Sequence, residues 1–588
     1  MAGRPRPLAA RGLRTLVRVA LGRAPAEALI THARVVNVFN HQISAPTSVA
    51  LAQGRVAAIG PEAPAWRGPD TQVWEAGGAY LLPGLIDAHT HLDSMFQLGP
   101  YSELALARGN TSAVTELAMM AGAWGINGLR LLLAEAAAAP LRVFSLAPPL
   151  VPPFPEWETS AGLSFENFKE ILAHPDCLGV GETYWPAIID GEERAAMNYA
   201  AAQALGKTLE GHGAGARGAR LMAYAAAGTT SCHESVSAAD AAERLALGLA
   251  VMVREGFVRR EMAAVVPALR DLPESGQAML VTDLADFEDL IAAGALNPLL
   301  AKAAALGVAP ARAVAWCSLN PARYFGLRYM GAVAPGYVAD LALVEDLQEF
   351  RARWVWLEGR LKAQQGRLLQ PPQAFVYPPS ASATLRCPPL PPEAFCLAAP
   401  GGRARVRVVE AAGDTITKEA QAELKVAQGN VLADPGQDVL KMAHVNRHSA
   451  ELKMALGFAK GWGLRQGALA TNLIWDTTNL FVAGCSEAEM SLAAETVRAM
   501  GGGLAVAAGQ RVLARLPLPI GGIISPEPVP EVHRMAEDCR RALAGLGCPL
   551  PRPFLRAQTF CFTGLPFLRL TDKGLVDVRA RKFVEVLL

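Results

Sequence analysis

The fold is decided by one stretch, Leu82-Pro83-Gly84-Leu85-Ile86-Asp87-Ala88-His89-Thr90-His91. After the Pro-Gly turn, the apolar pair Leu85 and Ile86 predicts a short buried strand that ends in His-Thr-His. Side chains at positions i and i+2 of a strand point to the same side, so His89 and His91 face one way together. Two imidazoles on one side of a buried strand form half of a divalent-metal site. The alternative is that one histidine is buried in the core and the other caps a loop.

The composition limits the class of protein. A length of 588 residues predicts two or three domains, and 51% hydrophobic with 19% charged residues predicts a large buried core. The formal net charge of +1, from 55 basic and 54 acidic residues, gives no electrostatic reason to expect nucleic acid or an acidic membrane as a partner. Since no uninterrupted apolar run reaches about 18 residues, we expect no membrane-spanning helix.

The cysteines and the N-terminus bear on the compartment. Nine cysteines are scattered without a CxxC pair or a regular spacing, which predicts reduced thiols in a cytoplasmic protein. The first 23 residues hold six arginines and no acidic residue, which is typical of a transit-type segment or of a helix with a basic face. Leu13, Val17 and Leu21 recur every four residues with arginines between them. Because no signal-type apolar core follows, we predict a surface helix.

Changes in the apolar pattern divide the chain into five segments. Residues 1–80 predict an N-terminal helix and a β module, and residues 330–366 return to strands that pair with that module. Residues 81–329 alternate short apolar runs with helical stretches, which predicts an α/β fold with a TIM (β/α)8-type barrel. The Pro-rich residues 367–402 predict a linker or a wrapping segment. Residues 403–588 mix strands and helices and predict an additional C-terminal α+β domain.

Further ligand candidates follow predicted barrel strands, at the strand ends where TIM-barrel active sites lie. Four of them end separate apolar or glycine-rich runs: Glu182, His212, His233 and Asp283. Each alone is weak evidence, because a polar residue after such a run is usually a solvated loop residue. With the two histidines of the first strand, however, the set supplies enough ligands for two metals that share a bridging carboxylate.

Several motifs resemble the amidohydrolase superfamily and, within it, the adenine deaminase family. The stretch at 83–91 is similar to the superfamily's first-strand signature, and residues 319–322 and 331–341 are similar to its return into the β domain. Four segments of the last domain resemble adenine deaminase segments in the same order: Gly457-Phe458-Ala459-Lys460-Gly461, residues 465–470, residues 516–522 and residues 570–578. The resemblance covers nearly the whole chain.

The resemblance implies a metal-dependent hydrolase with a ligand set. His89 and His91 would bind one divalent metal, His212 and His233 would bind a second, and Glu182 would bridge them. The implied cofactors are two divalent ions, manganese or iron, with zinc as a further option. A metal pair can lower the pKa of bound water from 15.7 towards about 7, which suits hydrolytic deamination of adenine to hypoxanthine and ammonia.

The resemblance also implies catalytic roles. Asp283 would contact the metals, take a proton from the attacking water and pass it to the departing ammonia. Glu234, next to His233, would protonate a ring nitrogen of the purine and would need a raised pKa in a dry pocket for this. Asp476 and Asn479 lie in a loop after an apolar run, and we expect them to contact the substrate at the barrel mouth. The alternative for both is that they cap local structure.

Positions beside the ligands depart from the family pattern, which puts the exact substrate in question. The family's Asp-Pro-His-Glu becomes Glu116-Leu117-Ala118-Met119, so a histidine is lost, and its Thr-Asp-Asp-Arg-His becomes Thr282-Asp283-Leu284-Ala285-Asp286. Unpaired polar ligand atoms cost about 1–3 kcal/mol each, so we expect measurable but poor adenine turnover. The alternatives are an amidohydrolase for another purine or cyclic amide or amidine, and a non-catalytic paralog. In each enzymatic case we expect a small heterocyclic substrate and a homo-oligomer.

Overall fold

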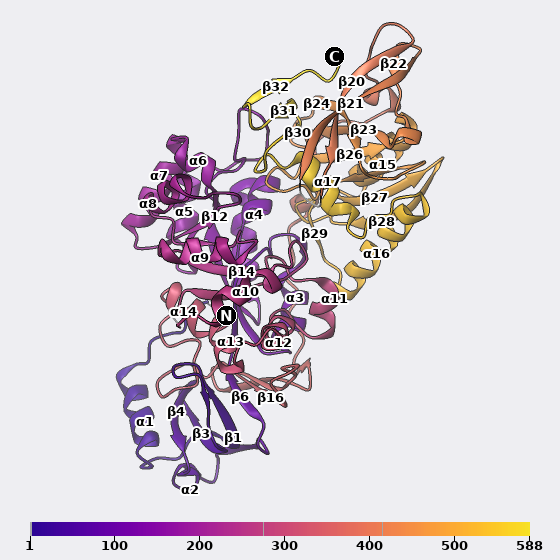
Figure 1. The fold of residues 1–588 in the computed structure, drawn as a ribbon. Coiled ribbons are helices and arrows are strands. Elements are labelled where there is room, and N and C mark those ends of the chain that lie inside the picture. Colours follow the sequence, from indigo (N-terminus) through magenta and orange to yellow (C-terminus); the bar gives the residue numbers. More distant parts are fainter. Residues whose placement is uncertain (1–2, 274–275, 414–415) are drawn as a thin grey trace.

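The computed structural model describes all residues except 1–2, 274–275 and 414–415. The molecule is elongated, with a β domain at one end, a barrel in the middle and a mixed domain at the other end (Figure 1). In the described part of the chain, no helix combines the length and the apolar character that a bilayer crossing requires.

Strands from before and after the barrel form one sheet. Eight of its ten described strands follow the path β19-β18-β17-β16-β6-β1-β3-β4, and the other two, β2 and β5, pair with β1. Strand β6 (Tyr80–Pro83) lies antiparallel to β16 (Leu341–Val344) and so joins the two segments. The other strands are β1 (Ala28–Asn37), β2 (Gln42–Ile43), β3 (Thr47–Ala52), β4 (Arg55–Gly60), β5 (Gln72–Glu75), β17 (Ala352–Leu357), β18 (Arg360–Gln364) and β19 (Arg367–Leu368). Helices α1 (Ala10–Ala20) and α2 (Ala63–Trp66) pack on this sheet.

The middle of the chain forms the barrel. Among the described residues, a five-stranded and a three-stranded parallel sheet supply its eight strands: β7 (Leu85–Thr90), β9 (Asn110–Thr115), β10 (Arg142–Ala147), β11 (Cys177–Tyr184), β12 (Thr208–His212), β13 (Ser231–Cys232), β14 (Ala250–Arg254) and β15 (Ala278–Val281). Thr282 closes the ring between β15 and β7, because its backbone N–H and hydroxyl donate to the carboxylate of Asp87 at 3.2 and 2.6 Å. The predicted α/β class with a TIM barrel is confirmed.

Helices surround the strands, as the alternating apolar pattern requires. They are α3 (Leu98–Leu106), α4 (Ala118–Ala138), α5 (Phe165–Ala173), α6 (Trp185–Ile189), α7 (Glu193–Ala204), α8 (Ala219–Ala226), α9 (Ala238–Ala246), α10 (Met262–Arg270), α11 (Phe287–Ala292), α12 (Asn297–Ala305), α13 (Pro310–Trp316) and α14 (Leu319–Tyr324). All six residues of β7 are buried, including the polar residues Asp87, His89 and Thr90.

One buried ion pair links the barrel to the β domain. The Arg142 guanidinium donates to Asp340 at 2.9 Å and to Glu358 at 2.8 Å, and the Arg142 side chain is 1% exposed. Arg142→Met leaves the Asp340 carboxylate buried without its cation, so we expect a loss of about 3–5 kcal/mol of folding stability, seen as a lower temperature of the first thermal transition. Arg351→Met, which breaks the exposed pair with Glu349, is the matched control and should leave that temperature unchanged. An unchanged transition in Arg142→Met would contradict this assignment.

The Pro-rich segment wraps along the molecule between the barrel and the last domain. It contains the short helices η1 (Pro379–Ser382) and η2 (Pro392–Phe395). Its backbone oxygen at Phe375 accepts a hydrogen bond from Gln97 of the barrel at 2.9 Å, and the Tyr377 hydroxyl donates to Glu135 at 2.6 Å.

The C-terminal domain is built on a mixed sheet of nine described strands in the order β22-β21-β20-β24-β23-β26-β25-β27-β28. These are β20 (Arg403–Ala411), β21 (Thr417–Ala427), β22 (Asn430–Val431), β23 (Val439–Val445), β24 (Met454–Lys460), β25 (Ala468–Thr471), β26 (Leu480–Gly484), β27 (Gly503–Ala508) and β28 (Arg511–Pro517). The domain also contains α15 (Glu487–Ala499), α16 (Val529–Gly545), α17 (Pro553–Cys561), η3 (Pro435–Gln437) and the small sheet of β30 (Leu568–Thr571), β31 (Gly574–Asp577) and β32 (Lys582–Val584).

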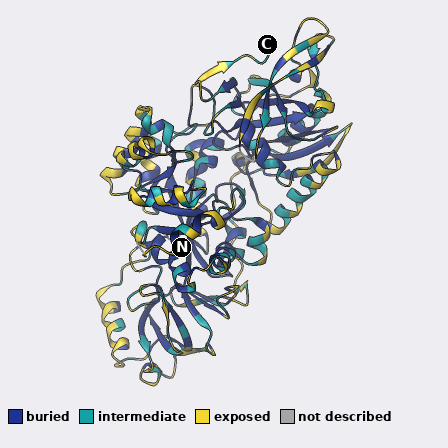
Figure 2. Cartoon of the chain, in the orientation of Figure 1, coloured by how far each residue is buried: buried dark blue, intermediate teal, exposed yellow. Residues whose placement is uncertain are grey.

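The barrel and the C-terminal domain share one hydrophobic core. The same buried cluster contains Leu117 and Met120 of the barrel and Leu440, Leu504 and Ile523 of the last domain. Strand β29 (Ile524–Ser525) also pairs in parallel with β8 (Met95–Phe96), which follows the His-Thr-His stretch. Buried residues therefore continue from the barrel into the C-terminal domain (Figure 2).

Candidate metal centre and active site

The ends of the barrel strands bring all six predicted metal ligands together. Each lies at or just beyond the carboxyl end of its strand, which is the end where TIM-barrel active sites form. In the described part of the chain, they form three overlapping groups of possible ligand atoms within 4.8 Å of one another: His89, His233 and Asp283; His89, His91 and Glu182; and Glu182, His212 and His233.

Glu182 lies at the centre of this cluster. Its Oε2 atom is 2.9 Å from Nδ1 of His212 and 3.1 Å from Nε2 of His233, and its Oε1 atom is 3.6 Å from Nε2 of His91. One carboxylate thus faces histidines from three strands with both of its oxygens. This is the arrangement that a bridging ligand requires.

Asp283 faces the first-strand histidines. Its Oδ1 atom lies 3.1 Å from Nε2 of His91 and 3.3 Å from Nε2 of His89. Burial would raise the pKa of Asp283, but the two histidines and Arg254 outweigh burial and hold that pKa well below its usual range. Asp283 and Leu284 both adopt a left-handed backbone, with φ of 48° and 75°. Non-glycine residues in this region cluster at functional sites.

The donor set fits divalent metals. Both ring nitrogens of His89 and Nε2 of His212 are buried, and within the described part of the chain they have no hydrogen-bond partner. A buried polar atom without a partner costs free energy, so these nitrogens need a ligand that accepts their lone pairs. Histidine and carboxylate together are typical ligands of zinc, manganese and iron sites.

No sequence pattern indicates Arg254, which the structure places beside the cluster. Its guanidinium pairs with Glu234, with Asp283 at 3.3 Å and with Glu261 at 2.9 Å, and its side chain is only 3% exposed. No local motif marks it, because its partners come from neighbouring strands and from the loop that follows β14.

Glu234 lies in the site as predicted, but its pKa is lowered, whereas the sequence predicts a raised pKa. Burial would raise its pKa, yet Arg254, His212 and His233 outweigh burial and lower it to about 2. Glu234 is therefore a carboxylate here. The expectation failed because it counted the dry pocket and missed the arginine.

Glu116 is a second acidic group beside the ligands. It is fully buried, its Oε1 atom accepts a hydrogen bond from the backbone N–H of Glu182 at 3.0 Å, and the same atom lies 3.6 Å from Nδ1 of His89. Burial and the like charge of Glu182 raise the pKa of Glu116 to about 8. A Cβ atom at Gly181 would lie 2.1 Å from this carboxyl, so the glycine makes room for it.

The two substrate-binding candidates in the C-terminal domain, Asp476 and Asn479, differ in whether they line the cavity. Asp476 lines the same cavity as the metal ligands, and its Oδ2 atom accepts a hydrogen bond from the Tyr184 hydroxyl at 2.9 Å. Burial raises the pKa of Asp476 to about 7. Asn479 is not among the described residues that line this cavity. Its amide donates to the Thr159 carbonyl at 2.9 Å and accepts from the backbone N–H of Arg447 at 3.1 Å, so it holds local structure.

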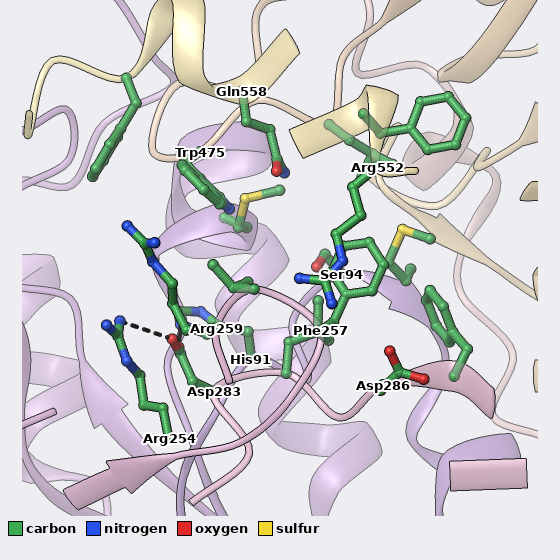
Figure 3. Close-up of a pocket in the computed structure, with 18 of the residues that line it drawn as sticks. His91, Ser94, Arg254, Phe257, Arg259, Asp283, Asp286, Trp475, Arg552 and Gln558 are labelled. Carbon is green, nitrogen blue, oxygen red and sulfur yellow. Dashed lines mark hydrogen bonds and ion pairs between the residues drawn. The ribbon is translucent and has the colours of Figure 1, made fainter. Parts of the chain in front are cut away.

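A cavity of about 510 Å³ opens from the metal ligands towards the C-terminal domain (Figure 3). The barrel contributes His91, Ser94, Arg254, Phe257, Arg259 and Asp283, and the C-terminal domain contributes Trp475, Arg552 and Gln558 among others. The last domain thus forms one wall of the site. Trp475 directly precedes Asp476 in the loop that the sequence linked to the substrate, whereas no predicted substrate motif contains Arg552 or Gln558.

Two segments anchor the C-terminal domain at the cavity. The Thr563 hydroxyl donates to the buried Glu158 at 3.0 Å, and the backbone N–H of Thr159 donates to Asp572 at 2.9 Å. Both partners on the barrel side lie in the loop that follows β10. The wall is therefore fixed to a barrel loop by hydrogen bonds as well as by the shared core.

Comparison with known proteins agrees with this architecture. Residues 80–362 match the Amidohydrolase family, and residues 414–582 match the Adenine deaminase C-terminal domain. The chain is 36% identical to an adenine deaminase of Moorella thermoacetica, with 99% of each chain covered. It is 33% identical to an adenine deaminase of Dehalococcoides mccartyi, with 97% of this chain and 99% of the relative covered. The chain belongs to the adenine deaminase family of the amidohydrolases.

Proposed function

We propose that the protein is a metal-dependent adenine deaminase that converts adenine and water to hypoxanthine and ammonia. The observation that carries this proposal is the convergence of His89, His91, Glu182, His212, His233 and Asp283 at the end of a cavity whose far wall is the C-terminal domain. The domain matches that of adenine deaminases, and relatives that carry this name match along their whole length.

We infer two divalent ions, manganese or iron, with zinc as the third option. His89 and His91 would hold one, His212 and His233 the other, and Glu182 would lie between them. Bound there, such ions supply a water whose pKa is low enough to lose a proton near neutral pH. The lowered pKa of Asp283 and Glu182 keeps both carboxylates ionised and able to serve as ligands.

Asp283 moves the proton in this proposal. It is ionised, it lies beside His89 and His91, and its Oδ2 atom is 3.3 Å from Arg254, which holds it in place. It takes a proton from the attacking water and returns it to the amino group that leaves C6 of adenine as ammonia. Glu234 lies next to His212 and His233, at 3.7 Å from each, and lines the same cavity.

Deamination of adenine is the direct test. Protein loaded with manganese, iron or zinc is incubated with adenine, and hypoxanthine and ammonia are measured together. We expect both products in a one-to-one ratio, with loss of both after chelation and recovery on re-addition of metal. A metal-loaded protein that forms neither product from adenine would overturn the proposal.

A second candidate substrate class is favoured by the apolar side chains in the cavity. Ala118 and Leu284, which stand where family members carry polar residues, both line it. They offer no hydrogen bond to a purine edge, which supports the expectation that adenine is turned over poorly and that another cyclic amidine or amide is a better substrate.

Ala118→His tests this expectation by gain of function. A restored imidazole that pairs one polar atom of adenine recovers about 1–3 kcal/mol, so kcat/KM for adenine should rise roughly 5- to 100-fold. Ala121→Ser, on the same helix but buried away from the cavity, is the control and should not raise it. A wild-type kcat/KM within the ordinary range of about 10⁴–10⁸ M⁻¹s⁻¹, together with no gain in Ala118→His, would contradict changed specificity.

The compartment and the assembly stay predictions. All nine cysteines lie in the described part of the chain, where none forms a disulfide, and this supports the predicted cytoplasmic location. The predicted homo-oligomer is checked by the mass of the purified protein in solution.

A further inference from the structure

An aromatic wall faces the metal ligands from the C-terminal domain. It consists of Trp475, in the loop after β25, and Phe562, directly after α17, and both residues line the cavity. We propose that this wall, with Phe562 as its centre, is the surface on which the purine ring of the substrate stacks. This inference rests on the proposed function and assigns the C-terminal domain a direct part in substrate binding.

Phe562 lies close to the metal centre. Its ring centroid is 6.4 Å from that of His212 and 5.5 Å from that of Tyr184, which follows Glu182 on β11. The centroid of Trp475 lies 5.1 Å away at an interplanar angle of 76°. A flat ligand whose reacting carbon lies at the metal ligands is therefore within contact distance of this wall.

The Phe562 ring is held in place before any ligand binds. The backbone carbonyl of Phe562 accepts a hydrogen bond from the fully buried Arg569 at 2.9 Å, and the backbone N–H of Phe562 donates to the Gln558 carbonyl at 3.0 Å. A Cβ atom at Gly564 would lie 2.6 Å from the ring, so the glycine leaves the space that the ring occupies. With Thr563 bonded to Glu158 of the barrel, the wall is fixed relative to the metal ligands.

The Trp475 loop is fixed in a similar way. Asp476 and Thr478 adopt a left-handed backbone, with φ of 63° and 53°, and the Asp476 carboxylate is bonded to Tyr184. A Cβ atom at Gly122 of α4 would lie 2.0 Å from the Asp476 carbonyl oxygen, so loop and barrel helix are in direct backbone contact. Strain of this kind persists where the surrounding structure holds it, which is typical of a binding site.

The barrel side of the cavity and the aromatic wall opposite it together favour a flat heterocycle as the ligand. Near the metals the barrel side presents charged groups, among them Glu182, Glu234, Arg254 and Asp283, which suit the polar edge of the ligand. Trp475 and Phe562 instead present aromatic rings, and a nucleobase stacks on such rings whatever its edge pattern. The wall thus explains how a purine can be held even where Ala118 and Leu284 offer its edge no hydrogen bond.

The test uses the full-length, metal-loaded protein and hypoxanthine, the expected product, whose dissociation constant is measured by calorimetry. Loss of the stacking ring should raise that constant roughly 5- to 100-fold in Phe562→Ala, and loss of Trp475, whose ring stands at 76° to that of Phe562 and so meets the purine edge-on, should raise it by less in Trp475→Ala. Phe562→Leu keeps apolar volume but has no π face, and should raise it at least roughly fivefold. In steady state KM for adenine should rise more than kcat falls, because stacking holds ground state and transition state alike.

Val576→Ala is the structural control. Val576 is buried in the same hydrophobic cluster as Phe562 but is not among the described residues that line the cavity. It should lower the melting temperature and leave the hypoxanthine dissociation constant unchanged. Metal content is measured for every variant. If Phe562→Ala has a folding or metal defect, the hypoxanthine dissociation constant of Phe562→Leu decides whether the ring stacks on the ligand.

The two proposals fail in distinguishable ways. Absence of hypoxanthine formation from adenine by the wild-type protein would overturn the proposed function. Wild-type turnover of adenine, combined with unchanged hypoxanthine binding in Phe562→Leu and Trp475→Ala at full metal content, would overturn the stacking wall alone. An equal weakening of binding in Val576→Ala would also overturn it, since packing and not stacking would then carry the effect.

Discussion

We expect Glu182→Gln to abolish adenine deamination and to lower the bound metal from the proposed two ions per chain to fewer than about one. The amide keeps the shape of the side chain but removes the negative charge that both oxygens direct at His91, His212 and His233. A neutral amide cannot bridge two cations, because it offers one weak donor oxygen in place of two charged ones. Ammonia release and metal analysis of the purified variant measure the two effects.

Glu537→Gln is the matched control for this substitution. Glu537 lines the outer part of the same cavity and pairs with Arg540 at 2.8 Å, away from the metal ligands. We expect full metal content and near wild-type turnover. A Glu182→Gln protein that keeps both metals and full activity would show that the site works without its central carboxylate. His89→Ala should behave like Glu182→Gln, because His89 takes part in two of the three ligand groups.

We expect Asp283→Asn to lower kcat by at least roughly a hundredfold while the fold survives. The amide cannot take a proton from water, whereas the carboxylate of Asp283 is ionised and lies 3.1 Å from His91 and 3.3 Å from His89. The residue is buried at the end of β15, so the isosteric change preserves packing. Single-turnover ammonia release on metal-loaded protein separates the chemical step from product release.

Asp286→Asn is the control for that loop. Its carboxylate caps α11 by accepting from the backbone N–H groups of Glu288 and Asp289, and asparagine caps helices about as well. We expect turnover within about twofold of wild type, since the cap is kept. Wild-type turnover in Asp283→Asn would remove Asp283 from the reaction, and an equal loss in both variants would assign the effect to loop structure.

The clustering of the candidate metal ligands could be predicted from the sequence because each follows a local pattern. His89 and His91 end a short apolar run, and β7 extends over Leu85–Thr90, as that run and the i, i+2 rule indicate. Glu182 lies near the carboxyl end of β11 and His212 ends β12. His233 directly follows β13, and Asp283 lies two residues after β15. Parallel barrel strands place such ends on one face, so topology turns five separate patterns into one site.

Residues that act through non-local pairing could not be predicted. Arg254 gains its role because β14 lies between β13 and β15, which sets it beside Glu234 and Asp283. The low pKa of Glu234 follows from that same contact, so its predicted raised pKa failed for the same reason. Hydrophobic periodicity describes which face of a strand is buried and says nothing about which charge lies opposite.

Which C-terminal residues line the cavity could not be predicted from the sequence, for a related reason. Asp476 and Asn479 lie three residues apart in one loop, yet the left-handed backbone at Asp476 and Thr478 turns the first towards the cavity and the second towards Thr159. No residue pattern predicts that turn. Phe562 follows helix α17, and only the docking of the C-terminal domain on the barrel brings its ring close to that of His212.

One measurement tests the central claim most directly: hypoxanthine formation from adenine by protein stripped of metal and then titrated with manganese, with bound metal counted at each step. We expect no hypoxanthine from the stripped protein, and an activity that rises with bound metal and levels off at about two ions per chain. Glu182→Gln should form none at any metal concentration. Hypoxanthine formation at the full rate by the metal-free protein, or by Glu182→Gln, would contradict a metal-dependent adenine deaminase built on this ligand cluster.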